Sequence, residues 1–118
     1  MNKRSIGTLY ENLAREFLVK QGYEIVECNF RCKMGEIDII AWDGRYLSFI
    51  EVKYRAKEYY GQAVYAVSPK KQQVISRVAA FYLMKKRLPE NTPCKFDVIA
   101  IDGKQLQLYK NAFDYLGY

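Results

Sequence analysis

Histidine is absent from the 118-residue sequence, and this absence limits the chemistry that the protein can perform. A Ser-His-Asp triad, a Cys-His dyad, a histidine-ligated zinc site and the histidine-dependent nucleases are all excluded. Carboxylates and lysines must therefore carry any acid–base or metal chemistry. Cysteine is scarce: Cys28, Cys32 and Cys94 have no CxxC spacing, and an odd number without a secretion signal favours reduced thiols. The sequence has no long apolar run and no signal-peptide pattern, so we expect a cytoplasmic protein that does not contact a membrane.

Positive charge and apolar residues are plentiful. Lysine and arginine number 19 against 13 acidic residues, which gives a net charge of +6, and half of all residues are apolar. This length and composition are normal for one folded domain, so we expect residues 1–118 to form a single one. The basic charge favours a polyanionic partner such as nucleic acid, although it would also serve the solubility of a protein-interaction domain.

The central stretch, residues 35–53, predicts a β-hairpin because two apolar, β-branched runs flank Asp43-Gly44. With Asp43-Gly44 as a two-residue loop, the opposed pairs are Trp42 with Arg45, Asp38 with Phe49, and Glu36 with Glu51. Opposed residues share a face, and side chains alternate faces along each strand. Four charged residues then project from one face: Glu36, Asp38, Glu51 and Lys53. Asp38 and Glu51 would be diagonal neighbours about 7–8 Å apart at Cα, whereas a loop of odd length would put them on opposite faces.

Three carboxylates on one face of a strand pair are costly unless a cation compensates their charge. Oxygen ligands from Asp and Glu suit Mg²⁺ or Mn²⁺, with water in the remaining positions. We therefore expect Asp38 and Glu51 to hold a divalent metal, with Glu36 as an auxiliary candidate. Lys53 would orient an attacking water or stabilise negative charge during phosphodiester hydrolysis. The alternative is an ion-pair network that joins Lys53 to Glu36 or Glu51.

Three ordered motifs resemble a known family. Asp38 followed by Glu51-Val52-Lys53 resembles the PD-(D/E)xK nuclease signature, with Ile37 where a proline often stands. More closely, segments 35–40 (GEIDII), 49–53 (FIEVK) and 96–98 (FDV) resemble the YraN-type family of predicted endonucleases, which is similar to archaeal Holliday-junction resolvases. The resemblance covers nearly the whole chain. It implies a restriction-endonuclease-like core and a metal-dependent nuclease that acts on DNA in a branched or otherwise structured form.

The resemblance also implies roles for residues outside the acid pair. The Val52 carbonyl would help to bind the metal, and Glu11 on the first helix would approach the site. Gln62, in a loop, would position a water or a phosphate. Paired cutting of a four-way junction would need a homodimer. The aromatic tail would supply its interface, or would fold back onto its own sheet; the tail comprises Tyr109, Phe113, Tyr115 and Tyr118.

Periodicity and capping signals predict the remaining elements. A helix should run from residue 6 or 8 to 21, ended by Gly22, and Thr8-x-x-Glu11 fits a capping box that gives Glu11 a structural reading as well. A second helix should begin at Ser68-Pro69 and reach residue 86 or 87. Further strands are expected at 23–30, 95–101 and 105–109. The fold should be α/β, ordered α-β-β-β-α-β, with a mixed sheet, helices on both faces and one parallel pair made by a right-handed crossover.

Basic and aromatic residues accompany the predicted site. The expected phosphate contacts are Arg31, Lys33, Arg55, Lys57, Lys70 and Lys71. Lys70 and Lys71 fall in the first turn of the second helix, where backbone amides also favour anions. Four tyrosines would stack on unpaired bases or pack on the domain: Tyr54, Tyr59, Tyr60 and Tyr65. Asp97 is expected either to be structural or to support the site residues without binding the metal itself. The alternative function is a non-catalytic nucleic-acid-binding module on a nuclease scaffold.

Overall fold

The computed structural model describes residues 3–55, 67–103 and 105–115. Gln62, Lys57, Tyr59, Tyr60, Tyr65 and Tyr118, all named above, lie outside the described residues. The elements in chain order are α1 (Lys3–Lys20), β1 (Glu24–Cys32), β2 (Gly35–Asp43), β3 (Tyr46–Arg55), α2 (Pro69–Lys85), β4 (Cys94–Asp102) and β5 (Gln105–Phe113). The expected order is confirmed, and the last strand extends four residues further than the sequence indicated.

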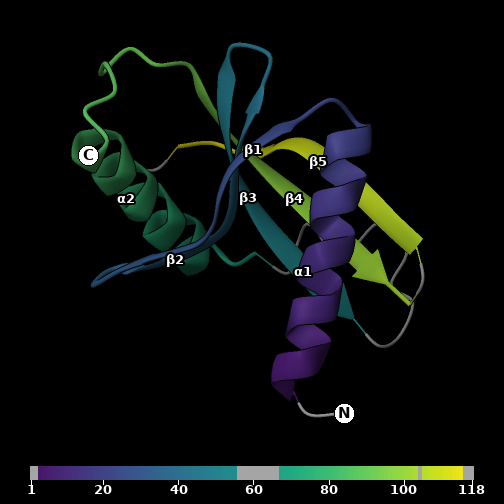
Figure 1. Cartoon of the computed structure of the whole chain (residues 1–118). Helices are drawn as coiled ribbons and strands as arrows, with labels where there is room; N and C mark the ends of the chain where they lie inside the picture. The colour runs from purple at the N-terminus through teal and green to yellow at the C-terminus, as the bar shows by residue number, and fades with distance from the viewer. Residues whose placement is uncertain (1–2, 56–66, 104, 116–118) are drawn as a thin grey trace.

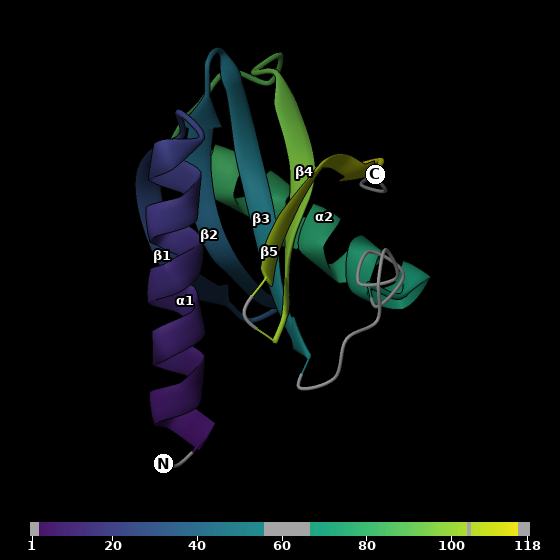
Figure 2. The same cartoon turned by 90° about the vertical axis from the view of Figure 1, so that its right-hand side faces the viewer.

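The five strands form one mixed sheet in the order β1-β2-β3-β4-β5 (Figure 1). β3 and β4 are parallel, as expected for strands joined through a helix, and the other three neighbouring pairs are antiparallel. Figure 2 shows α1 and α2 on opposite sides of the sheet. The predicted α/β fold, with a mixed sheet and a helix on each face, is therefore confirmed.

α1 covers one face of the sheet through Ala14 and Leu18, which are fully buried against Ile39 and Ile50. The helix ends where the sequence indicated, with Gly22 in the left-handed region at φ 94°. Its start differs, because α1 begins at Lys3 and already contains Thr8. The predicted capping box is therefore wrong, since the amides of an interior turn bond to carbonyls four residues earlier and leave nothing for Thr8 to cap.

α2 covers the other face and begins at the predicted cap. Ser68 is the N-cap, Pro69 opens the helix, and the Ser68 side chain accepts a hydrogen bond from the Lys71 backbone N–H at 3.1 Å. Its buried residues pack on Phe49 and Phe96 of the sheet. They include Ile75, Val78, Ala79 and Tyr82. Among the described residues, neither helix has the length and apolar character needed to cross a membrane.

Candidate active site

The β2–β3 hairpin turns one residue later than the sequence predicted. Asp43 pairs with Tyr46, so Gly44 and Arg45 form the loop, and the predicted pairing of Trp42 with Arg45 is wrong. Gly44 takes φ 61°, which a glycine at the first position of a tight hairpin turn adopts without steric cost. The corrected loop still has two residues, so the parity of the strands is unchanged.

The corrected register brings the two acids closer than expected. Ile39 pairs with Ile50, and continuing this register by one position sets Asp38 opposite Glu51 instead of diagonal to it. Both project toward the face that α2 covers, since Ile40 and Phe49 beside them belong to the core under α2. The prediction that Asp38 and Glu51 share a face is consistent with this register.

The β2–β3 ladder stops at this point, and a side chain replaces the backbone. Strand pairing between β2 and β3 ends at Ile39 and Ile50. The next amide of β3 that faces β2 belongs to Val52, and it donates to Oδ2 of Asp38 at 2.8 Å. The N–H and C=O of one strand residue point toward the same neighbour, so the Val52 carbonyl also faces the Asp38 side. Asp38, Glu51 and the Val52 carbonyl thus lie around one gap in the sheet.

Burial gives both acids unusual protonation behaviour. Only 7% of Glu51 is exposed, and burial together with the nearby Asp38 charge raises the pKa of Glu51 from its ordinary 4.5 to about 7. Burial likewise raises the pKa of Asp38, although the hydrogen bond from Val52 opposes this effect. The nearby lysines lower the pKa of both carboxyl groups, but they do not offset the effect of burial.

Two lysines from different elements approach the same carboxylate oxygen. Nζ of Lys53 lies 3.8 Å from Oε1 of Glu51, and Nζ of Lys71 lies 3.9 Å from that atom. Lys53 comes from β3, two residues beyond Glu51, and Lys71 comes from the first turn of α2. Both separations exceed hydrogen-bond length, so each ammonium lowers the pKa of Glu51 without fixing its geometry.

The other two predicted acids are engaged elsewhere. Nε of Arg31 donates to Oε2 of Glu36 at 2.8 Å, which joins directly opposed residues of β1 and β2. Both oxygens of Glu11 accept from the side-chain amide of Asn29 at 2.9 Å. Among the residues that the structure describes, no three His, Cys, Asp or Glu side chains gather closely enough to hold a metal ion. The geometry therefore brings together two acids and two lysines.

Asn29 connects Glu11 to the neighbourhood of the acid pair. It lies in β1 between Cys28 and Phe30, whose partners in β2 are Ile39 and Ile37, so Asn29 stands beside Asp38 in the adjacent strand. Its φ of 54° is left-handed, a conformation that asparagine tolerates better than most residues. No signal in the sequence singled out Asn29.

The predicted phosphate contacts have different surroundings. Arg31, Lys33 and Lys70 are exposed, and Lys33 lies in the turn between β1 and β2. Arg55 is the last residue of β3, beyond the point at which β3 stops pairing with β2. Tyr54 is 41% exposed and stacks on Tyr10 of α1, with ring centroids 3.8 Å apart.

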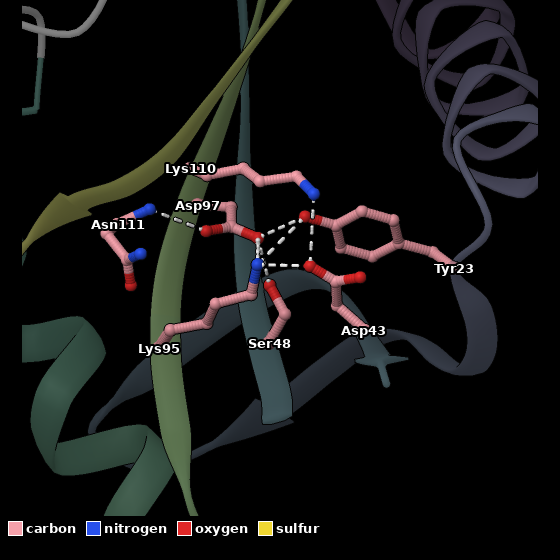
Figure 3. Close-up of polar contacts among 7 residues, drawn as sticks. All are labelled: Tyr23, Asp43, Ser48, Lys95, Asp97, Lys110 and Asn111. Atoms are coloured by element: carbon pink, nitrogen blue, oxygen red, sulfur yellow. Dashed lines mark hydrogen bonds and ion pairs between the residues drawn. The ribbon is translucent and has the colours of Figure 1, made fainter. Parts of the chain in front are cut away.

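A second polar cluster lies on the opposite face of the sheet (Figure 3). At its centre is Asp97, which is fully buried. Its Oδ2 accepts hydrogen bonds from Tyr23 at 2.6 Å and from Ser48 at 2.7 Å, and lies 3.2 Å from Nζ of Lys95. Its Oδ1 accepts from the Asn111 backbone N–H at 2.9 Å, where β5 bulges away from β4. Asp97 thus has partners in three strands and in the segment before β1.

The cluster is electrically balanced, in contrast to the acid pair. Asp43 pairs with Lys95 and lies 3.3 Å from Nζ of Lys110, so two acids meet two lysines. Ser48 and Asp97 each lie two residues before Ile50 and Ile99, which face α1, so they share that face. The sheet therefore separates this cluster from Asp38 and Glu51. The geometry favours the structural role expected of Asp97.

The aromatic tail folds onto its own sheet. Phe113 stacks on Phe96 with centroids 5.0 Å apart, Tyr115 lies 6.2 Å from Phe96, and Tyr109 packs against the same core. Tyr115 is 52% exposed. The tail was expected either to form a dimer interface or to fold back onto its own sheet, and these contacts are of the second kind. A homodimer stays a prediction.

Comparison with known proteins identifies the family. The family model described as "Uncharacterised protein family UPF0102" matches residues 10–101, a range that contains all three sequence motifs. The chain belongs to the UPF0102 family. A UPF0102 protein of Lachnoclostridium phytofermentans is 45% identical over 117 residues, which cover 99% of each chain. The UPF0102 protein of Syntrophus aciditrophicus is 45% identical over 112 residues, or 92% of this chain and 87% of the relative.

UPF0102 membership confirms the family to which the motifs pointed. A third relative, from Alkalilimnicola ehrlichii, is 43% identical over 107 residues, which cover 91% of this chain and 85% of its own. These relatives carry the family name alone. The activity of this UPF0102 protein must therefore be argued from its own residues.

Proposed function

We propose that this protein is a metal-dependent nuclease that hydrolyses phosphodiester bonds in DNA. The observation that carries the proposal is the acid pair, in which Glu51 is buried, Asp38 is half-buried, and both have raised pKa values although two lysines approach Glu51. Carboxylates removed from water close to one another are costly, and they cluster at sites where a bound cation or a reaction uses them. The resemblance to PD-(D/E)xK nucleases and to Holliday-junction resolvases supports the same function and a restriction-endonuclease-like core.

The residues around the gap fit a divalent cation. Oδ2 of Asp38 is occupied by the Val52 amide, which leaves its other oxygen, the Glu51 carboxylate and the Val52 carbonyl as ligands. Three oxygen ligands with water in the remaining positions suit Mg²⁺ or Mn²⁺. A bound Mg²⁺ would polarise the phosphate and lower the pKa of a coordinated water.

The remaining groups of the site fit a phosphodiester substrate. Lys53 is held on the strand that carries Glu51, so its ammonium is placed to orient a water or to stabilise negative charge on the phosphate. Exposed Arg31, Lys33 and Lys70 supply positive charge for the DNA backbone. DNA in a branched or structured form is the substrate that the resolvase resemblance favours, and cutting it in pairs would require a homodimer.

A cleavage assay tests the proposal directly. Branched, nicked, flapped and linear DNAs would be incubated with the protein and Mg²⁺ or Mn²⁺, alongside Asp38→Asn and Glu51→Gln. We expect cleavage that needs the metal and falls at least a hundredfold in either variant, since each removes a ligand. Glu90→Gln, which changes an exposed acid after α2, is the matched control. Equal cleavage by all four proteins would show a contaminating nuclease and sink the proposal.

One observation favours a second function. Only two acids gather at the site among the described residues, fewer than a closed protein cage for a metal would use. A non-catalytic nucleic-acid-binding module on the same scaffold would keep the basic surface and dispense with the metal. Binding of DNA with unchanged affinity in Glu51→Gln, together with no cleavage by any protein, would establish this alternative.

A further inference from the structure

Lys71 lies at the site although it is not part of the PD-(D/E)xK motif. Its Nζ lies 3.9 Å from Oε1 of Glu51, although the two residues come from different elements and lie twenty positions apart. Lys53 already lies 3.8 Å from the same oxygen. Two ammonium groups therefore approach one carboxylate oxygen.

This arrangement conflicts with a metal on the same oxygen. A divalent ion bound to this oxygen of Glu51 would lie close to both ammonium groups, and like charges at such short range repel one another even in water. One lysine has to move when the metal binds. Lys53 is the more confined, with 28% of its side chain exposed and its backbone in the centre of the sheet. Lys71 is 39% exposed and stands at the start of a helix, so it is the one that can leave.

We propose that Lys71 is a stand-in cation, which neutralises Glu51 in the metal-free protein, is displaced when a divalent cation binds, and then contacts a phosphate of the DNA. The proposal rests on the metal-dependent function given above and adds a positioning residue to it. Released from Glu51, the ammonium stays tethered beside the site and faces the same substrate as Lys53.

Two local features hold the Lys71 backbone over the acid pair. The Ser68 cap accepts from the Lys71 amide, which fixes the first turn of α2. Gly35, at the start of β2, lets α2 approach closely, because a Cβ on Gly35 would stand 2.7 Å from Cγ1 of Val74. Only the side chain of Lys71 is therefore free to exchange partners.

The proposal predicts that removing the Lys71 charge strengthens metal binding and weakens DNA binding, and both can be measured. Mn²⁺ binding would be measured by calorimetry at pH 8, and DNA binding with Ca²⁺ in place of Mn²⁺ over a range of salt. In Lys71→Met we expect Mn²⁺ to bind about threefold to tenfold more tightly, because a repelling charge is gone. We expect the slope of the logarithm of the DNA-binding constant against the logarithm of salt concentration to become smaller by about one, because one phosphate contact is lost. Lys71→Arg should resemble the unchanged protein in both measurements.

The controls separate this role from folding and from net charge. Lys20→Met removes the same charge from an exposed position at the end of α1, on the other face of the sheet, and should leave Mn²⁺ affinity unchanged. Weaker binding of both Mn²⁺ and DNA by Lys71→Met would indicate a merely structural lysine and overturn the proposal, as would unchanged Mn²⁺ affinity. If the unchanged protein binds no Mn²⁺, the proposed function falls with it, whereas Mn²⁺ binding that ignores Lys71 overturns this inference alone.

Discussion

Replacing Glu51 with glutamine should stabilise the protein at pH 8 and change its stability little at pH 4.5. Glu51 is buried, and its pKa is raised from 4.5 to about 7 by burial and by the charge of Asp38. Between pH 4.5 and about pH 7, Glu51 keeps a proton in the folded protein that it has released in the unfolded chain. The free energy of unfolding therefore falls as pH rises through this window.

The size of the effect follows from the pKa. Each pKa unit corresponds to about 1.4 kcal/mol, so a rise from 4.5 to about 7 makes ionised Glu51 cost the folded state about 3 kcal/mol above pH 7. Glutamine has nearly the same shape and does not ionise. The stability of Glu51→Gln relative to the unchanged protein should therefore grow by about 3 kcal/mol between pH 4.5 and pH 8.

Urea unfolding at several pH values, followed by the fluorescence of the single tryptophan, Trp42, measures this difference. Glu90→Gln, at an exposed position, should give a difference that does not vary with pH. Mn²⁺ should stabilise the unchanged protein and not Glu51→Gln, because only the former has the ligand. If the acids and lysines were instead a stabilising ion-pair network, Glu51→Gln would be less stable at pH 8, and that outcome would refute the reasoning.

Three further changes test the fold around the site by chemical denaturation. Asp97→Ala should lower the free energy of unfolding by about 3–5 kcal/mol, because it leaves the buried Lys95 ammonium with Asp43 as its remaining carboxylate partner. A loss below about 1 kcal/mol would contradict a stabilising role for the cluster. Tyr23→Phe removes only the hydrogen bond to Asp97 and should cost about 1–2 kcal/mol. Gly35→Ala should cost about 2 kcal/mol, since its Cβ would meet Val74. Adding Val74→Ala to Gly35→Ala should recover part of that lost stability. If the stability change of the double variant equals the sum of the two single changes, the contact with Val74 is not the cause of the loss.

The acid pair could be predicted although the predicted hairpin loop was wrong. The sequence places Asp38, Glu51 and Lys53 in strands on either side of a short turn. Whether two residues share a face depends only on whether the loop length is even or odd. The true loop is displaced by one residue but keeps its length, so the predicted parity between Asp38 and Glu51 is kept while each opposed pair shifts.

Two other contacts of the site could not be predicted in the same way. Glu36 pairs with Arg31 across a second tight hairpin, in which β1 extends to Cys32, two residues beyond the predicted end of that strand. Lys71 reaches Glu51 because α2 returns across the sheet after a long connection. Sequence spacing gives the direction of a side chain within one hairpin, but the register between more distant elements is decided by packing.

The Asp97 cluster was missed for a related reason. Lys95 and Asp97 stand two residues apart in an otherwise apolar strand, which predicts that they share a face. Their partners come from residues far apart in the chain, including an amide exposed by the bulge in β5. Charged residues at alternate positions in a buried strand were thus the available signal, and they identify only Lys95 and Asp97.

The sheet separates two groups of acids that affect the fold in opposite directions. The Asp97 cluster holds strands together, whereas Asp38 and Glu51 oppose folding once they are ionised. A descendant of this protein that was released from selection for catalysis would gain stability from mutations at Asp38 or Glu51 and lose it at Asp97. Random drift should therefore erase the acid pair first and leave well-folded, inactive relatives. Within such a lineage, the survival of both acids would itself report that the site is still in use.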